Sequence, residues 1–354
     1  MHFSSTVAIA ECLLGESVER EPIIERIRDN LRATNGFHLV PTETAVAASD
    51  RPAAVCVDGA VISSQTDTLL WVAVAATTSD GSIEHQAAAA TPTGSHGEAV
   101  RSGAMAAAEL LVAVHTADQV GHVWMDGSLR TPLIALAASL SAVPEEAADA
   151  WARTLRDAHI VDLVGGYIEL AYQGRVSALP KQDTVSVFAR EWSELVDGAD
   201  AQWLRLQRDR TLVADLLTPG MFLAPRAAPE LNVLPTPDSP HRALRQLQED
   251  LADVLTWWRE VPTSVTYVMP RHLHRPIKVE LVCDADTVPH ERAAAMATTV
   301  DRLCRGPVML EPRHQWEADH RAKRLVAVVD MNLRATVAAS FGERRPDAVR
   351  GYRT

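Results

Sequence analysis

The sequence has few cysteines and few lysines, and it lacks a long apolar run. Its four cysteines (Cys12, Cys56, Cys283 and Cys304) are far apart and form no CxxC pair. This spacing argues against a zinc ribbon and a disulfide framework and fits a reducing compartment, so we expect a cytoplasmic protein. No run of about 18 apolar residues occurs, and no basic stretch followed by an apolar core opens the chain, so we expect neither a membrane span nor a secretory signal.

Three widely used catalytic motifs are also missing. The chain contains no GxxxxGKS/T loop, no HExxH motif and no GxSxG turn. We therefore expect no ATP hydrolysis through a P-loop, and the sequence signatures of zinc metalloproteases and of serine hydrolases are not found.

The net charge of −12 is unevenly distributed along the chain. Residues 1–180 contain 10 Lys and Arg against 22 Asp and Glu, whereas residues 181–354 contain 24 of each. Lys181, Lys278 and Lys323 are the only lysines. The chain is therefore not a basic protein that coats nucleic acid, and any contact with DNA must be local.

The length and the apolar pattern predict a globular α/β protein. At 354 residues, 47% hydrophobic and 23% charged, the chain is typical of soluble globular proteins, and its length allows one domain or two. We expect strands at 53–58, 68–77, 121–126, 176–179, 265–269 and 277–283, and a shorter strand after the turn at 79–82. We expect helices at 19–33, 98–117, 129–140, 144–158, 186–197, 201–217, 241–260, 289–304 and 313–340, and a proline-rich loop at 224–240. The order of elements in 53–140 implies a mixed sheet covered by helices.

Two of the expected strands end on an aspartate that is followed at once by glycine. These strands are Val55–Gly59, with Asp58, and Val123–Gly127, with Asp126. An aspartate at the end of a buried strand is costly to desolvate unless a cation or hydrogen-bond donors compensate its charge. Together with a glutamate from the helix between them, the two could form an oxygen-rich site for Mg²⁺ or Mn²⁺, of the kind that hydrolyses phosphodiesters. The alternative is two unrelated Asp-Gly turns.

Two glutamates of the helix at 98–117 are candidates for the third carboxylate. Glu109 lies within the apolar run 106–112, where a lone acid needs a reason. Glu98 lies near the start of the helix, where an acid is favoured simply by the helix macrodipole. We therefore favour Glu109, and Glu98 stays the alternative.

Ten short segments, taken in order, resemble motifs of a known family. They are Val57–Gly59, Leu69–Val74, Glu109, Asp126–Leu129, Ser177–Lys181, Asp209, Leu216–Gly220, Val265–Tyr267, Pro276–Glu280 and Ala318–Ala322. In this order they resemble the NurA nucleases, metal-dependent enzymes with an RNase H-like fold. Two positions differ: the first motif continues with Ala60 rather than serine, and the Tyr-Pro segment that precedes the last motif is replaced at Gly306 by Gly-Pro-Val.

The resemblance implies an α/β fold with an RNase H-like mixed β-sheet flanked by helices and with additional helices and a β-hairpin in the C-terminal half. Residues 1–50 would be an N-terminal helical extension and residues 341–354 a tail. Residues 51–340 would form one NurA-like domain, its RNase H-like core at about 53–190 and its helical and hairpin part at about 190–340.

The resemblance also implies a role for each site residue. Asp58, Glu109 and Asp126 would bind Mn²⁺ or Mg²⁺, and His320 would be a fourth ligand or a proton-handling group, with His314 or Asp319 in its place if the helix register differs. Lys181 would stabilise phosphate or the developing charge.

The function implied by the resemblance is DNA cleavage, of the 5′–3′ exonuclease and single-strand endonuclease type. It would serve DNA end processing, repair or defence, together with a HerA-type hexameric ATPase, in a homodimer that contacts no membrane. The alternative from another class is a non-catalytic RNase H-like subunit that binds DNA or a partner, favoured by the altered first motif and the acidic N-terminal half. An RNA substrate is a third possibility.

Overall fold

A computed structural model describes residues 20–33, 39–41, 54–65, 69–182, 185–235, 238–239, 241–273, 275–282, 290–304 and 311–341. Of the predicted tail at 341–354, only Phe341 is among these residues. Cys12, Cys283 and the Gly-Pro-Val segment that begins at Gly306 also lie outside the described residues. Within the predicted N-terminal extension, residues 20–33 are helical.

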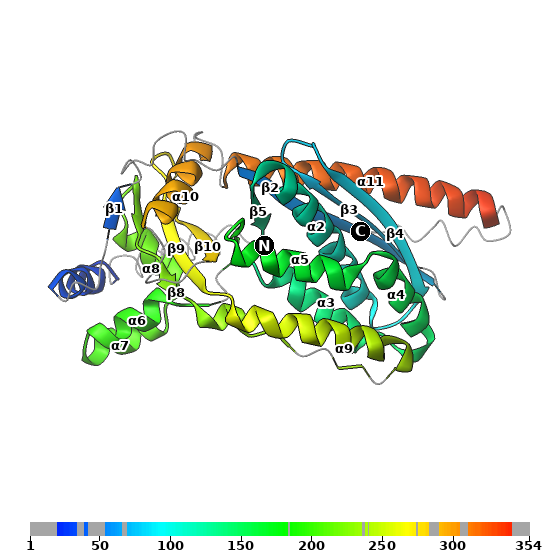
Figure 1. Ribbon diagram of the computed structural model, residues 1–354. Helices are drawn as coiled ribbons and strands as arrows, with labels where there is room; N and C mark the ends of the chain where they lie inside the picture. Colours follow the sequence, from blue (N-terminus) through cyan, green and yellow to red (C-terminus); the bar gives the residue numbers. More distant parts are fainter. Residues whose placement is uncertain are drawn as a thin grey trace, which may run out of the picture.

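The described strands form one mixed sheet (Figure 1). Its order is β1-β7-β9-β10-β6-β5-β2-β3-β4, and β8 pairs with β9. The strands are β1 (Leu39–Pro41), β2 (Ala54–Gln65), β3 (Leu69–Thr78), β4 (Glu84–Pro92), β5 (His122–Asp126), β6 (Val176–Leu179), β7 (Met221–Leu223), β8 (Arg226–Ala227), β9 (Thr263–Met269) and β10 (Ile277–Val282). The mixed α/β fold predicted from the sequence is therefore confirmed.

Helices cover both faces of this sheet. They are α2 (Gly97–Val120), α3 (Thr131–Ala142), α4 (Glu145–Asp157), α5 (Ile160–Tyr172), α6 (Phe188–Leu195), α7 (Gly198–Arg205), α8 (Asp209–Leu216), α9 (Arg242–Trp257), α10 (His290–Leu303) and α11 (Arg313–Phe341). In Figure 1, α2, α3, α5 and α9 lie on one side of strands β2 to β4, and α11 runs along the other side. No described helix is long and apolar enough to cross a membrane.

Successive side chains of the central strands pack into different cores on the two faces of the sheet. Val57 and Met125 join the large core beneath α2, α3, α5 and α9, whereas their neighbours Cys56 and Trp124 pack toward α10. Such alternation is what a pleated strand buried on both faces requires. A further core joins residues 20–33, α6, α7, α8 and the strands β7 and β9.

Strand register brings Asp58 and Asp126 to the same level of the sheet, although only β5 ends at its aspartate. β2 and β5 are parallel and pair Val57 with Met125, so the next residues, Asp58 and Asp126, lie side by side. β6 is parallel to β5 and pairs Leu179 with Asp126. β2 continues to Gln65, beyond the end of β5, and there keeps only β3 as its described partner.

Three features of local structure differ from the sequence prediction. The strand that was predicted to end at Asp58 is β2, which continues to Gln65. α5 was not predicted, because Gly165-Gly166 interrupts its apolar run. The single helix expected at 201–217 is two helices, α7 and α8. The break places Asp209 where its carboxylate accepts hydrogen bonds from the backbone N–H groups of Val187, Phe188 and Ala189 at the start of α6.

Candidate active site

Asp58 and Asp126 form the centre of the candidate site, at the point where β5 ends and β2 continues. Both carboxylates are almost completely buried. Asp58 Oδ1 accepts a hydrogen bond from the N–H group of Gly59, 2.8 Å away. Two carboxylates on neighbouring strands at one level of a sheet concentrate negative charge in the protein interior, where charge is poorly solvated.

Glu109 reaches the same place from α2. Its side chain is buried against Gly59, where an added Cβ atom would lie 2.7 Å from Glu109 Oε1 and 2.8 Å from Glu109 Cγ. A glycine is therefore required at position 59 for this approach of helix to strand. Glu98, the alternative, lies in the first turn of α2 with 73% of its side chain exposed, and pairs with Arg101 at 3.1 Å.

The electrostatics of the three acids reflect their proximity. Burial raises the pKa of Asp58 far above its usual range, and the nearby Asp126 and Glu109 raise it further, while Lys181 opposes them. Burial, followed by the charge of Asp126, raises the pKa of Glu109 to about 8, against the effect of the Gly59 N–H group. If all three acids were ionised, their negative charge would exceed what the surroundings neutralise, so the metal-free site favours protonated carboxyl groups.

Lys181 supplies a cation to this cluster. It lies two residues beyond the end of β6, and its Nζ atom is 2.8 Å from Asp126 Oδ2 and 3.4 Å from Glu311 Oε2. Burial opposes its charge, but the attraction of Asp126, Glu311 and Asp58 is larger in sum and raises the pKa of Lys181. Glu311 was not predicted from the sequence.

The first turns of α11 contribute two further polar groups. The buried Gln315 donates from Nε2 to Asp126 Oδ1 at 2.6 Å and to the carbonyl oxygen of Leu179 at 2.9 Å. One turn later, Asp319 adds its negative charge to the field at Asp58 and pairs with Lys323 at 2.7 Å. Sequence reasoning missed Gln315; the signal was its four-residue spacing from Asp319, which puts both on one face of the helix.

The structure does not bring His320 into contact with the three acids. Its side chain is 53% exposed and stacks on Trp316, with ring centroids 4.1 Å apart, and its Nδ1 lies 3.9 Å from Asp319 Oδ2. Because successive helix residues are rotated by about 100°, the residue after Asp319 points away from the row that faces the sheet. His314 lies one residue before Gln315 and is partly buried.

A buried ion pair supports the loop that follows Asp126. Lys278 and Glu280 of β10 are both completely buried, with Lys278 Nζ 3.3 Å from Glu280 Oε1. The second oxygen of Glu280 accepts from Ser128 Oγ at 2.7 Å and from the N–H group of Leu129 at 3.0 Å. The sequence pattern predicts only a hairpin for these strand residues and does not indicate that they support the loop.

The three carboxylates are suitable ligands for a divalent cation, although Gln315 and Lys181 contact Asp126 in the structure. Among the residues that the structure describes, no three His, Cys, Asp or Glu side chains are grouped as a metal site. Both oxygens of Asp126 already accept from nitrogen donors, those of Gln315 and Lys181. Buried carboxylate oxygens with excess negative charge are what Mg²⁺ and Mn²⁺ prefer, so a cation would compete with Lys181 for Asp126.

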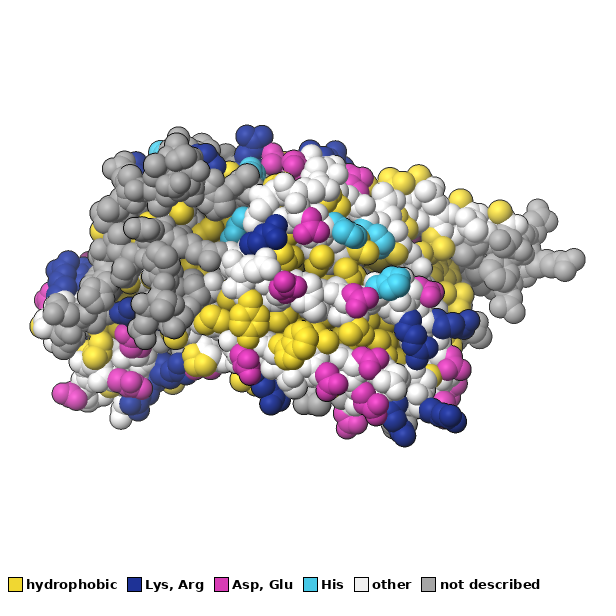
Figure 2. Space-filling view, viewed as in Figure 1, with side chains coloured by type: hydrophobic (Ala, Val, Ile, Leu, Met, Phe, Trp, Pro, Cys, Tyr) yellow, Lys and Arg dark blue, Asp and Glu magenta, His cyan; other side chains and the backbone are white. Residues whose placement is uncertain are grey.

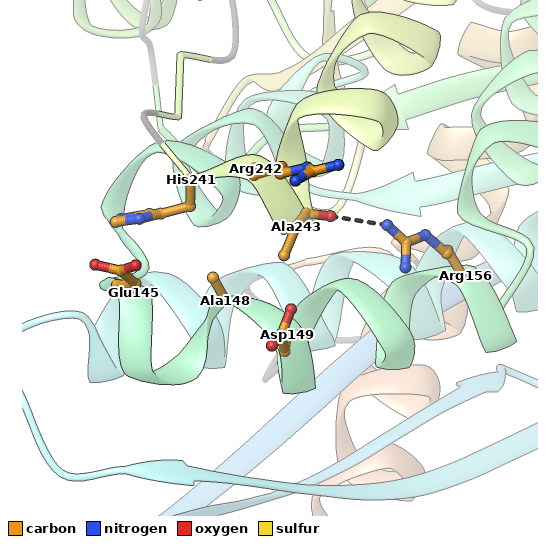
Figure 3. Close-up of a pocket in the computed structure, with 7 residues that line it drawn as sticks. All are labelled: Glu145, Ala148, Asp149, Arg156, His241, Arg242 and Ala243. Atoms are coloured by element: carbon orange, nitrogen blue, oxygen red, sulfur yellow. Dashed lines mark hydrogen bonds between the residues drawn. The ribbon is translucent and has the colours of Figure 1, made fainter.

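A surface pocket lies elsewhere, between α4 and the start of α9 (Figure 3). It has a volume of about 440 Å³ and shares no residue with the carboxylate cluster. Its lining carries both charges: Glu145, Ala148, Asp149, Arg156, His241, Arg242 and Ala243. Arg156 Nη2 donates across it to the carbonyl oxygen of Ala243 at 2.7 Å, which ties α4 to α9.

Similarity to known proteins is found at the level of the fold and not at the level of the sequence. No family model matches the sequence, and no curated protein matches it. Three solved structures are similar along nearly the whole chain. The NurA nuclease from Sulfolobus solfataricus is 14% identical with a TM-score of 0.53, and NurA with manganese is 11% identical with a TM-score of 0.53; each comparison covers 95% of this chain and 98% of the other. A third NurA structure is 11% identical with a TM-score of 0.50, covering 99% of this chain and 100% of the other. The chain therefore has an α/β fold similar to that of the NurA nuclease structures.

Proposed function

We propose that this protein is a divalent-metal-dependent nuclease that hydrolyses the phosphodiester bonds of DNA. The observation that carries the proposal is the meeting of three buried carboxylates, Asp58, Glu109 and Asp126, from three separate elements. Their excess negative charge destabilises the fold unless a cation or protons compensate it. The similarity to NurA structures supports the same reading, and one of those structures contains manganese, which favours Mn²⁺.

In this proposal Asp58, Glu109 and Asp126 hold the metal. A divalent cation held by these carboxylates would supply Lewis-acid chemistry, which lowers the pKa of a water and compensates the charge on the leaving oxygen. Gln315 fixes the orientation of the Asp126 carboxylate through one oxygen, and Lys181, half exposed, offers its ammonium group to a phosphate beside the cluster. Mg²⁺ could replace Mn²⁺, since both prefer oxygen ligands.

The test uses two glutamates of the same helix as a matched pair. We expect Glu109→Gln to abolish cleavage of labelled DNA in Mn²⁺, whereas Glu98→Gln, on the exposed first turn, leaves the rate unchanged. Single-stranded DNA, duplex DNA and RNA are each incubated with Mn²⁺, with Mg²⁺ and with chelator. Cleavage that survives in Glu109→Gln and in Asp58→Ala, with both variants folded, would overturn the assignment.

The second candidate is a non-catalytic subunit that binds DNA or a partner. It is favoured by the nitrogen donors that occupy both oxygens of Asp126 and by the acidic N-terminal half. In Figure 2, charges of both signs are interspersed over the face that carries α4, α5 and α9, without a continuous basic surface. DNA binding without cleavage in any metal would favour this candidate.

The finer features of the function rest on the sequence resemblance. They are the 5′–3′ exonuclease and single-strand endonuclease activities, the homodimer, the HerA-type ATPase partner, the His320 role near the metal and the cytoplasmic location. Light scattering of the chain alone and with the ATPase tests the assembly. A monomer at micromolar concentration that the ATPase does not change would contradict both the dimer and the partner.

A further inference from the structure

Two exposed aromatic rings are stacked on α11, each one residue after a side chain that acts on the carboxylate cluster. Trp316 is 44% exposed, and the ring of His320, one helical turn later, lies against it at 4.1 Å with an interplanar angle of 30°. An exposed indole leaves a large apolar area in water. The stacked imidazole limits the rotation of the indole, which lowers the entropy cost of binding a flat ligand on the exposed part of the ring.

The phase of α11 places this pair on the flank next to the site. Gln315, the residue before Trp316, contacts Asp126, and Asp319, the residue before His320, acts on Asp58. On the opposite flank, Arg321 lies against the turn at Gly81, between β3 and β4, where an added Cβ would be 2.6 Å from its Nη1. The aromatic pair is therefore on the flank away from that turn, adjoining the row that faces the cluster.

Cationic side chains accompany the pair along the same part of α11. Arg313 and Lys323 are each 67% exposed and pair with Glu317 and Asp319. Arg324, one turn beyond His320, is also exposed. Aromatic rings interleaved with cations are typical of surfaces that bind single-stranded nucleic acid, because bases stack on the rings while phosphates contact the cations.

We propose that Trp316, backed by His320, is a stacking platform for an unpaired nucleobase of the strand whose backbone lies at Asp58 and Asp126. This proposal rests on the proposed nuclease function and adds to it the residue that binds the base of an unpaired nucleotide. Since stacking uses the face that every base has, the platform binds without preference for sequence.

The experiment measures binding separately from cleavage. Fluorescence anisotropy follows a labelled single-stranded oligonucleotide in Ca²⁺ in place of Mn²⁺, with a second oligonucleotide whose terminal nucleotides are abasic. We expect Trp316→Ala to weaken binding of the intact strand by about 5- to 100-fold, the value of one stacked base. Trp316→Phe keeps most of the affinity, and the abasic strand binds the wild type and Trp316→Ala equally.

Trp257 provides the matched control. It is 57% exposed, at the end of α9, on the side of the sheet opposite α11. We expect Trp257→Ala to bind like the wild type. Equal affinity of the wild type for intact and abasic strands, or unchanged affinity in Trp316→Ala, overturns the platform even if DNA is cleaved. A wild type that distinguishes the two strands but never cleaves overturns the nuclease function and supports the platform.

Discussion

The buried pair of Lys278 and Glu280 allows a prediction about the support of the Asp126 loop. Glu280→Gln keeps the volume of the side chain but removes its charge, and the ammonium group of Lys278 then stays buried without a counter-charge. Among the described residues, Lys278 Nζ has no hydrogen-bond acceptor, and its ion pair with Glu280 Oε1 supplies its counter-charge. Removing one partner of a buried ion pair costs about 3–5 kcal/mol. We therefore expect Glu280→Gln to lower the free energy of unfolding by about that amount.

The opposite single variant should cost less. Lys278→Met leaves the Glu280 carboxylate with its hydrogen bonds from Ser128 Oγ and the Leu129 N–H group. The loss then approaches that of one unsatisfied polar partner, about 1–3 kcal/mol. The double variant has no charge at either of these two positions and should be more stable than Glu280→Gln alone. The coupling energy then exceeds the cost of Lys278→Met by itself, about 1–3 kcal/mol.

Urea unfolding of the metal-free protein, followed by circular dichroism, gives the four free energies of this cycle. Glu98→Gln, which breaks the exposed pair with Arg101, is the control and should change stability by less than about 1 kcal/mol. Additivity of the Lys278 and Glu280 variants within about 0.5 kcal/mol would refute the reasoning, since independent sites add to that accuracy.

Three further predictions concern the site and its supports. Gly59→Ala places a Cβ 2.7 Å from Glu109 Oε1, so the carboxylate must move, and calorimetry should show weaker Mn²⁺ binding than in the wild type. Asp209→Ala removes three hydrogen bonds at the start of α6 and should lower the free energy of unfolding in urea by about 2–4 kcal/mol, because bonds to a charged group are strong. Because the pKa of Glu109 rises from 4.5 to about 8 on folding, the folded metal-free protein holds a proton that the unfolded chain releases between these values. Its stability should therefore fall as pH rises from about 4.5 to about 8, and urea titrations should show less of this fall in Glu109→Gln.

Much of the sheet could be predicted because its strands carry their signal locally. β6 has the predicted bounds, and β5 ends at Asp126 as predicted, since each is a short, mostly apolar run with a clear local end, Asp126-Gly127 for β5 and Pro180 for β6. The hairpin of β9 and β10 was likewise expected. α5 could not be predicted in the same way, because a glycine pair is unfavourable in a helix by itself, and the packing of α5 against α2 and α9 depends on the tertiary fold.

Some residues of the candidate site could be predicted from their neighbours in the sequence, whereas others depend on contacts between distant segments. A carboxylate in an apolar stretch of a helix stands out within a few residues, and the structure places Glu109 beside Gly59 and Glu98 on the surface. The contact between Gln315 and Asp126 joins residues 189 positions apart. No local sequence pattern predicts which strands α11 packs against, so its contribution to the site depends on the tertiary fold.

The same consideration applies to the fourth polar group near the acids. The sequence resemblance favoured His320 because it occupies the matching place in a motif, but position in a motif does not specify which side of a helix faces the sheet. The buried face of α11 includes Gln315, Ala318 and Ala322. Asp319 lies at the edge of this face, whereas His320 lies on the exposed side of the helix. The charge of Asp319 consequently acts on Asp58, and the imidazole is left to stack on Trp316. An additional acid at this point increases the charge that a cation must neutralise, so the helix phase favours metal binding by carboxylates over binding by histidine.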